Sequence, residues 1–445
     1  MISPLEAQAF ESTLAPDRTV RRRRLVLVSY HHSSDGAIGG MRWSGLTKYL
    51  ARHGWTSWIV TAAAATGHPN VISCPRRPTL NDAYRRLRAR NDSSAGSDAP
   101  ESAGELAGEP RSGVGILGRL RLEAAALLAI PDQGRGWILR AARAARKTIT
   151  EVWPDAVIST GPPHSAHVAA WLATRGTGVR RYVDFRDPWA GPTTAAWLKF
   201  PEHRSLVWRA WTETLEPMIV RSAAGVLCNT PEFAAALGGI YPEIPVHCVS
   251  NGVDLDLLPP RETERLPGLA LSYVGTLYGG RTLRPILAAL RLFLDRHPNA
   301  DASLRIAGHV DAQSLARLEA EIGELRLRAV VHILGVLSRA AALSLAGRSG
   351  LSIVLAQGQE LQVPAKLYEL VAMQVPTVAI AEPESATFNA AQRLAAWAVA
   401  PDDIRTLVRV FEGAAAHDIV ASARQAARTD VSYERLAGEL NEVLR

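Results

Sequence analysis

The chain has few cysteines and few lysines. Only 3 of its 445 residues are Cys, and Cys74, Cys228 and Cys248 lie far apart without CxxC spacing. This pattern excludes a disulfide framework and indicates a reducing compartment. Only four of the 50 basic residues are Lys. Arg is therefore the default cation, and a Lys inside a motif stands out.

Long apolar runs and several familiar motifs are also absent. No uninterrupted apolar run approaches the roughly 18 residues of a membrane-spanning helix. Acidic residues and Arg21–Arg24 precede the first apolar run, so we expect no signal peptide. No GxGxxG sequence occurs, which weakens a nicotinamide or flavin interpretation.

The net charge of +7 calls for anionic partners. No zinc finger, helix-turn-helix or aromatic-basic RNA motif accompanies this charge, so we expect no nucleic acid. A nucleotide substrate and an anionic membrane surface explain it more economically, with the protein cytoplasmic and peripheral on the inner face of the plasma membrane. The basic residues on both sides of the 91–115 insertion, from Arg85 to Arg90 and from Arg119 to Lys147, have two interpretations. One is an amphipathic, membrane-facing element, and the other is a solvated helix face.

Apolar β-runs alternate with helical segments along the chain, which predicts an α/β fold with parallel sheets. We expect an N-terminal tail (1–24), a Rossmann-like acceptor domain (25–258) with a flexible insertion (91–115), a Rossmann-like donor domain (268–428) and a C-terminal helix (429–445) that packs back on the first domain. The two Rossmann-like domains are expected to face each other across a cleft, where ligands bind at the carboxyl ends of the strands.

The segment 363–380 is the most informative part of the chain. Pro364 fits the first turn of a short helix, and Lys366 and Glu369 then lie on one helix face. A cation and a carboxylate at a helix start suit the phosphates and ribose hydroxyls of a nucleotide. The alternative is an exposed ion pair on a surface helix.

Two glycine-rich segments each follow a strand and precede a helix. The first runs from Gly36 to Arg42 and includes Gly39 and Gly40, with the helix expected from Met41. The second runs from Val274 to Arg281. Glycines let backbone N–H groups approach a phosphate closely, and an Arg binds a diphosphate with two hydrogen bonds. Both segments are candidate phosphate cradles, although a tight turn also uses glycine.

Two further motifs lie at predicted strand ends in the first half. Ser159–His167 brings His164 and His167 together, but no third metal ligand is evident, and a helix cap with a packed His is the favoured interpretation. Asp184–Trp189 carries two carboxylates around Arg186, where α/β enzymes keep functional groups. An Asp–Arg pair that fixes a loop is the structural alternative.

Taken together, these motifs and Asn251–Asp254 resemble the nucleotide-sugar glycosyltransferases of the GT-B fold, family 4. The resemblance covers the chain from about residue 25 and also includes Ile130–Asp132 with Gly136 and Trp137. It implies that Glu369 binds the ribose, that Arg281 and Lys366 hold the diphosphate, and that Gly39 and Gly40 line the donor–acceptor junction. Many members have two glutamates seven residues apart, whereas this chain has Leu361 at the first position and Glu360 one residue off register.

The hypothesis is therefore a retaining transfer of a sugar from a nucleoside diphosphate to an acceptor hydroxyl in glycan, glycolipid or glycoside synthesis, without metal or other cofactor. A sugar-nucleotide epimerase and a degenerate, membrane-associated assembly partner are the alternatives. The expected residues fall into three groups: catalytic Asp184, Asp187, Arg281 and Lys366; donor-binding Gly39, Gly40, Arg42, Gly275, Thr276, Arg281, Lys366, Leu367 and Glu369; and, on the acceptor or sugar side, His164, His167 and Arg186.

Overall fold

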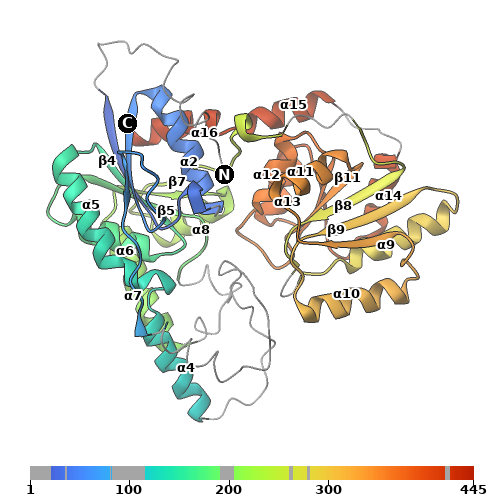
Figure 1. Cartoon of the computed structure of the whole chain (residues 1–445), viewed down its shortest axis with the longest axis horizontal. Coiled ribbons are helices and arrows are strands. Elements are labelled where there is room, and N and C mark those ends of the chain that lie inside the picture. The colour runs from blue at the N-terminus through green and yellow to red at the C-terminus, as the bar shows by residue number, and fades with distance from the viewer. Residues whose placement is uncertain are drawn as a thin grey trace.

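The computed structural model describes residues 22–35, 38–80, 82, 116–190, 205–259, 264–277, 281–415 and 421–445. The predicted N-terminal tail and the insertion at 91–115 lie outside these residues, apart from residues 22–24, with which the first strand begins. Two α/β domains stand side by side in Figure 1. Each is built on one parallel sheet, which confirms the predicted fold class.

The N-domain sheet has seven strands, and every neighbouring pair is parallel. Its central strands are runs of apolar residues buried on both faces, as parallel sheets require. In sheet order the strands are β3 (Val71–Ser73), β2 (Trp55–Thr61), β1 (Arg23–Ser29), β4 (Ala156–Gly161), β5 (Arg180–Phe185), β6 (Gly225–Cys228) and β7 (Val246–Cys248).

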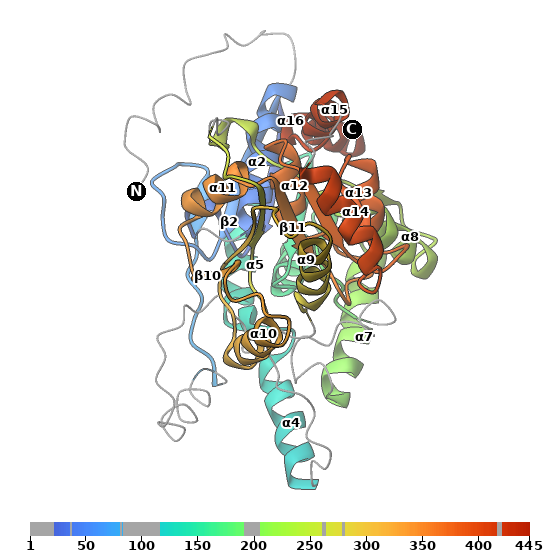
Figure 2. The ribbon, with the colours of Figure 1, turned by 90° about the vertical axis from the view of Figure 1, so that its right-hand side faces the viewer.

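The strand order 3-2-1-4-5-6 is that of a Rossmann sheet, here with one further edge strand. Six α-helices are described between residues 38 and 240, and α4 extends well away from the sheet in both views (Figures 1 and 2). They are α2 (Ile38–Leu50), α4 (Ile116–Ala129), α5 (Ile138–Val152), α6 (Ser165–Thr174), α7 (Leu206–Arg221) and α8 (Pro231–Ile240).

The C-domain sheet has six parallel strands with the same winding. In sheet order they are β10 (Val331–Gly335), β9 (Ala302–Ala307), β8 (Leu269–Val274), β11 (Leu351–Leu355), β12 (Thr377–Ile380) and β13 (Trp397–Val399). The helices that follow in the chain are α9 (Arg284–Arg296), α10 (Ala312–Glu324), α11 (Arg339–Arg348), α12 (Ala365–Ala372), α13 (Ala386–Arg393), α14 (Ile404–Ala415), α15 (Ala421–Asp430) and α16 (Tyr433–Leu444).

The last of these helices, α16, belongs to the N-domain by its packing. Leu436, Leu440 and Leu444 are fully buried in one cluster with Trp43 of α2 and Leu25 of β1. The expected C-terminal helix thus completes the core of the other domain, and the chain crosses between the domains twice.

The two crossing segments hydrogen-bond to each other. The Val253 N–H donates to the Val431 carbonyl at 2.8 Å, and the Tyr433 N–H donates to the Val253 carbonyl at 3.0 Å. These bonds join the segment that leaves the N-domain to the one that returns.

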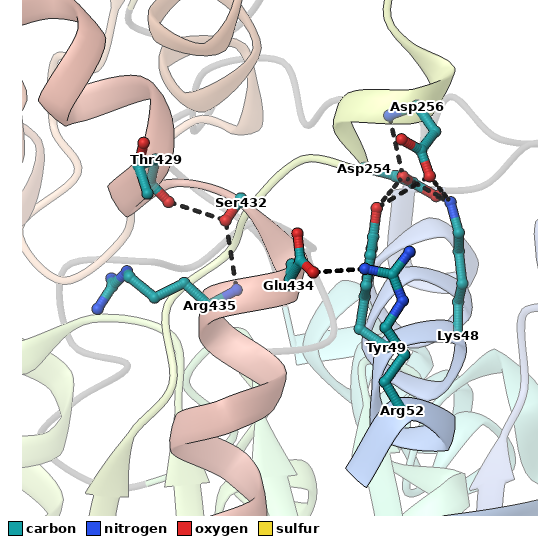
Figure 3. Close-up of polar contacts among 9 residues, drawn as sticks. All are labelled: Lys48, Tyr49, Arg52, Asp254, Asp256, Thr429, Ser432, Glu434 and Arg435. Carbon is teal, nitrogen blue, oxygen red and sulfur yellow. Dashed lines mark hydrogen bonds and ion pairs between the residues drawn. The ribbon is translucent and has the colours of Figure 1, made fainter. Parts of the chain in front are cut away.

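Side chains of α2 and of the turn that follows it hold the same crossing (Figure 3). The Lys48 ammonium lies 2.8 Å from Asp254 Oδ2 and 2.6 Å from Asp256 Oδ2. The Tyr49 hydroxyl donates to Asp254 Oδ1 at 2.8 Å, and Arg52 pairs with Glu434 of α16. A rare lysine is therefore used at the domain connection, at a place that the sequence patterns did not indicate.

Candidate active site

The carboxyl edges of the two sheets adjoin each other. Thr230, just after β6, donates through its hydroxyl to the Leu361 carbonyl of the C-domain at 2.7 Å. Glu232, at the start of α8, accepts a 2.9 Å hydrogen bond from Asn389 of α13. Residues that follow strands of both sheets thus meet at one junction, where ligands of open α/β sheets bind.

On the C-domain side, Glu369 is held between two cations. Lys366 lies 2.8 Å from Glu369 Oε2, as their spacing on α12 predicts, and Arg339 of α11 pairs with Oε1. The Glu369 side chain is 13% exposed, and that of Lys366 is 33% exposed. Burial alone would raise the pKa of Glu369, but Lys366 and Arg339 outweigh it and hold that pKa below its ordinary value. The carboxylate therefore stays ionised and able to accept hydrogen bonds.

The pairing with Arg339 was not predicted. Arg339 precedes Glu369 by 30 residues and comes beside it only because α11 and α12 flank the same strand, β11. One indication of this role was present in the sequence, because Arg339 is a cation at the start of a helix that follows a strand.

The second glycine segment follows β8 and lies at the same edge. Gly308, which has a φ of 141°, packs so closely on the Gly275 backbone that a Cβ on Gly308 would collide with it. The Tyr273 hydroxyl donates to the Thr276 carbonyl at 2.9 Å. Gly308 is thus a second glycine that this turn needs, and sequence reasoning did not identify it.

Arg281 follows that turn at the start of the next loop, and Tyr278 to Gly280 lie outside the described residues. Its neighbour Thr282 exchanges two 3.0 Å hydrogen bonds with the Gln357 amide, which follows β11. Gln357 thus ties the loop of Arg281 to the strand that leads to Lys366.

Leu367, which we expected to bind the donor, does not present its side chain to a ligand. Leu367 is 0% exposed and packs in the core cluster beneath α12. Leu367 directly follows Lys366 on α12, and its apolar side chain lies on the buried face of the helix.

The first glycine segment is helical, not a loop. Helix α2 begins at Ile38, three residues before the predicted start, so that Gly39 and Gly40 lie in its first turn; Gly36 and Ala37 lie outside the described residues. A Cβ on Gly39 would collide with the Arg186 guanidinium, and a Cβ on Gly40 with the His32 backbone. These glycines let the loop after β1 and the Arg186 side chain lie against α2.

Arg42 and Asp184 form a buried ion pair in the N-domain. Their side chains are 2% and 0% exposed, and Arg42 Nη2 lies 3.1 Å from Asp184 Oδ1. Arg42 also donates to the Ser250 and Val249 carbonyls, both at 2.7 Å. The predictions that Arg42 binds the donor and that Asp184 acts directly in catalysis are therefore corrected: both side chains are buried and bound to protein groups, and of the Arg42 guanidinium only Nε has no hydrogen-bond partner.

Further hydrogen bonds complete the environment of Asp184. Trp43 Nε1 and the Thr160 hydroxyl donate to its Oδ2 at 2.8 and 2.7 Å. Burial alone would raise the pKa of Asp184, yet Arg42 and these donors hold it below its ordinary value. Asp184 is a positioning residue that joins α2, β4 and β5.

The residues after Asp184 lie nearer to the junction. Arg186 and Asp187 are half-buried, and Arg186 donates to the Pro162 carbonyl. Asn229, which follows β6, donates to the Arg186 carbonyl at 2.9 Å. The loop after β5 is therefore fixed by the loops after β4 and β6.

The two histidines are buried side by side. His167 is 0% exposed, its Nδ1 lies 2.9 Å from the Ser159 hydroxyl, and burial lowers its pKa to about 3. The His164 ring stacks on Trp189 with centroids 4.9 Å apart. Among the described residues, no group of three or more His, Cys, Asp and Glu side chains is arranged to hold a metal ion. The packed-histidine interpretation fits this geometry.

Asp132, in the motif Ile130–Asp132, has a structural role. It accepts hydrogen bonds from the Ser165 N–H at 2.8 Å and the Ser165 hydroxyl at 2.5 Å, and so caps α6 from a distant part of the chain.

Leu361, at the position where a glutamate was expected, packs on the aromatic cluster of the N-domain around Phe185 and Phe233. Its neighbour Glu360 is exposed. An apolar residue suits this position because it lies at the contact between the domains.

Comparisons with known proteins give a family match over part of the chain. Residues 99–257 match the family model described as Glycosyltransferase Family 4. A search of curated proteins finds no significant match to the chain.

Solved structures extend the likeness to nearly the whole chain. A glycosyltransferase from Rickettsia africae shares 13% identity with a TM-score of 0.57, covering 96% of this chain and 98% of its own. Sucrose-phosphate synthase from Thermosynechococcus elongatus shares 14% with a TM-score of 0.60, covering 95% and 98%. The Anabaena protein HepE in complex with UDP shares 14% with a TM-score of 0.56, covering 95% and 99%.

The chain thus has the GT-B fold, with two Rossmann-like domains. Within it, residues 99–257 are similar to Glycosyltransferase Family 4.

Proposed function

We propose that the protein transfers a sugar from a nucleoside diphosphate sugar to an acceptor hydroxyl, with retention of the anomeric configuration. The observation that carries the proposal is the ionised Glu369 between Lys366 and Arg339 at the edge where the two domains meet. The neighbour HepE was solved with UDP, which supports a nucleotide ligand for this fold.

Each role follows from the chemistry of the side chain. The Glu369 carboxylate accepts hydrogen bonds from the two ribose hydroxyls. Lys366 and Arg281 supply positive charge for the diphosphate, with Arg339 as a further cation. The Gly275 N–H donates to the Ala307 carbonyl at 2.9 Å, so Gly275 contributes by its lack of a side chain, and the Thr276 N–H contacts the phosphates.

Departure of the diphosphate leaves an oxocarbenium-like sugar and a growing negative charge. Cations held in advance at this edge stabilise that charge without reorganisation, so the proposed reaction needs no metal. Arg186 and Asp187 are the N-domain candidates for contact with the sugar or the acceptor, and His164, stacked on Trp189, lies behind them. A role in glycan, glycolipid or glycoside synthesis, and a place at the inner face of the plasma membrane, stay predictions.

The test is calorimetric titration of Glu369→Gln and Arg281→Ala with UDP, GDP, dTDP and ADP. The nucleotide that binds the wild type should bind each variant at least about tenfold more weakly, a loss of about 1.4 kcal/mol. Glu360→Gln is the matched control, because this exposed acid lies nine residues before Glu369 and should leave the affinity unchanged. Equal affinity of all four proteins would refute the site.

Turnover decides between the remaining functions. A sugar nucleotide incubated with an acceptor should give a glycoside with the donor's anomeric configuration, read by NMR. A free epimer formed without an acceptor would indicate an epimerase, and tight nucleotide binding without turnover across acceptors would indicate a degenerate partner protein.

A further inference from the structure

Helices α4 and α7 form a projection at one end of the N-domain, most evident for α4 in both views (Figures 1 and 2). Five large apolar side chains of this α4–α7 projection are exposed, out of twelve such residues in the described part of the chain. They are Leu120 (60%), Leu127 (52%), Leu206 (72%), Trp211 (48%) and Met218 (38%). So many exposed apolar groups on two contacting helices mark an interaction surface.

The projection is a built unit. Glu123 of α4 accepts hydrogen bonds from the Ser205 hydroxyl at 2.5 Å and from the Leu206 and Val207 N–H groups at 3.0 and 2.9 Å, and so caps α7. The Ser205 hydroxyl bond and these N–H groups hold the pKa of Glu123 below its ordinary value. Near the C-terminal end of α4, Arg135 donates to the Leu127 carbonyl at 2.9 Å. The end of α4 and the start of α7 are therefore tied, and the one acid of α4 is directed toward α7.

The helices on this side of the N-domain carry more cations than acids, and most of the surplus lies on α5. Arg221 of α7 pairs with Glu243 outside these helices. Helices α4, α5 and α7 together hold eight Arg and Lys residues against four Glu. Of these glutamates, Glu123 is used by the α7 cap, Glu216 is buried, and Glu151 and Glu213 pair with Lys147 and Arg209. The surplus is cationic, and Arg119 on α4 is exposed beside Leu120.

The start of α5 continues the same chemistry. Leu139 is 61% exposed, and it lines a shallow hollow of about 570 Å³ together with Arg143, Arg146 and Lys147. Apolar groups next to long basic side chains are the combination that binds the headgroup layer of a bilayer, because the apolar groups enter the acyl boundary while the cations meet lipid phosphates.

We propose that the α4–α7 projection docks the protein on an anionic phospholipid surface, with Leu120, Leu127 and Trp211 entering the headgroup boundary and the surrounding arginines contacting lipid phosphates. No described helix is long and apolar enough to cross a membrane, so the contact is superficial. A second copy of the chain is the poorer occupant, because two copies joined through this face would bring positive charge against positive charge.

The test uses the full chain and two kinds of vesicle, one of phosphatidylcholine alone and one of phosphatidylcholine with phosphatidylglycerol. Wild type should sediment with the anionic vesicles at least about tenfold more strongly than with the neutral ones, and added salt should reduce the binding. Leu120→Asp with Trp211→Asp should lower the anionic binding by at least about tenfold. The matched control is Val336→Asp, a similar change at a C-domain side chain that is 74% exposed, and it should bind as wild type does.

Nucleotide titration of the same proteins separates this proposal from the sugar transfer. The Leu120→Asp, Trp211→Asp protein should keep its nucleotide affinity and melting temperature, which shows that it is folded and that only the membrane contact is lost. Equal binding of wild type to both vesicles, no binding to either, or full binding by the double variant would overturn the proposal. So would a dimer in analytical ultracentrifugation that the double variant abolishes, because the face would then join two copies of the chain.

Discussion

Glu216 of the N-domain and Glu369 of the C-domain are both largely buried glutamates, and their surroundings shift their pKa values in opposite directions. Glu216 accepts hydrogen bonds from the neutral Ala190 N–H and Tyr241 hydroxyl, and burial raises its pKa to about 7. Glu369 lies between Lys366 and Arg339, which keep its pKa low despite burial.

The same contrast extends to the two domains. In the N-domain, Arg42 and Asp184 form a buried pair whose further hydrogen bonds go to other protein groups. In the C-domain, Lys366 and Glu369 remain partly accessible. A charged motif at a strand end therefore does not by itself identify a ligand contact, because it also serves to join elements within a domain.

The largest expected effect is on the buried N-domain pair. Arg42→Leu leaves the Asp184 carboxylate buried without its cation, and we expect the free energy of unfolding to fall by about 3–5 kcal/mol. Urea unfolding measures this change. The matched control is Arg52→Leu in the turn directly after the same helix, whose exposed pair with Glu434 should contribute about 1 kcal/mol or less. Equal losses of stability in the two variants would show that burial does not make the Arg42–Asp184 pair more important than the exposed one.

An intermediate effect should depend on pH. The pKa of Glu216 is about 7 in the folded protein against 4.5 as the reference, so the folded state binds more protons between these values. Its contribution therefore destabilises the fold as pH rises from about 4.5 to about 7, by an amount on the order of 3 kcal/mol, and levels off above.

Glu216→Gln should remove this pH dependence. Urea unfolding at about pH 5 and about pH 8 should show the variant gaining stability relative to wild type as the pH rises. Glu213→Gln, on the same helix but exposed, is the control and should follow wild type at both pH values. A constant difference between Glu216→Gln and wild type would contradict the raised pKa.

The smallest effect is expected for an exposed C-domain pair. Arg291 lies 2.8 Å from Asp295 one turn further along α9, and both side chains are accessible to water. Arg291→Gln should lower the free energy of unfolding by only about 0.3–0.5 kcal/mol. Thermal unfolding of Arg291→Gln and Arg42→Leu under the same conditions measures the difference between the two pairs. A loss above about 2 kcal/mol in Arg291→Gln would contradict the small contribution expected of its pair.

Much of the fold could be predicted from sequence because parallel strands are local apolar runs, and Leu25–Ser29 and Leu351–Leu355 show this plainly. The pairing of Lys366 with Glu369 could also be predicted from the sequence, because a spacing of three residues brings two side chains together on one helix face. The sequence did not predict their neighbours Arg339, Gln357 and Gly308, because only the assembled sheet places these residues near the site.

The errors have physical causes as well. Gly39 and Gly40 suggested a loop, but in the structure they are helical residues whose lack of a Cβ admits Arg186 and the His32 backbone. Asp184 suggested catalysis because nothing in the local sequence shows that Arg42, 142 residues earlier, closes over it.

The packing of α16 has a consequence for synthesis. Leu436 and Leu440 fill the core of the N-domain, yet they follow the whole C-domain in the chain. Domains generally fold in order as they leave the ribosome. Here the C-domain can complete its folding first. The N-domain keeps Trp43 and Leu46 exposed until α16 has been synthesised and packs on them.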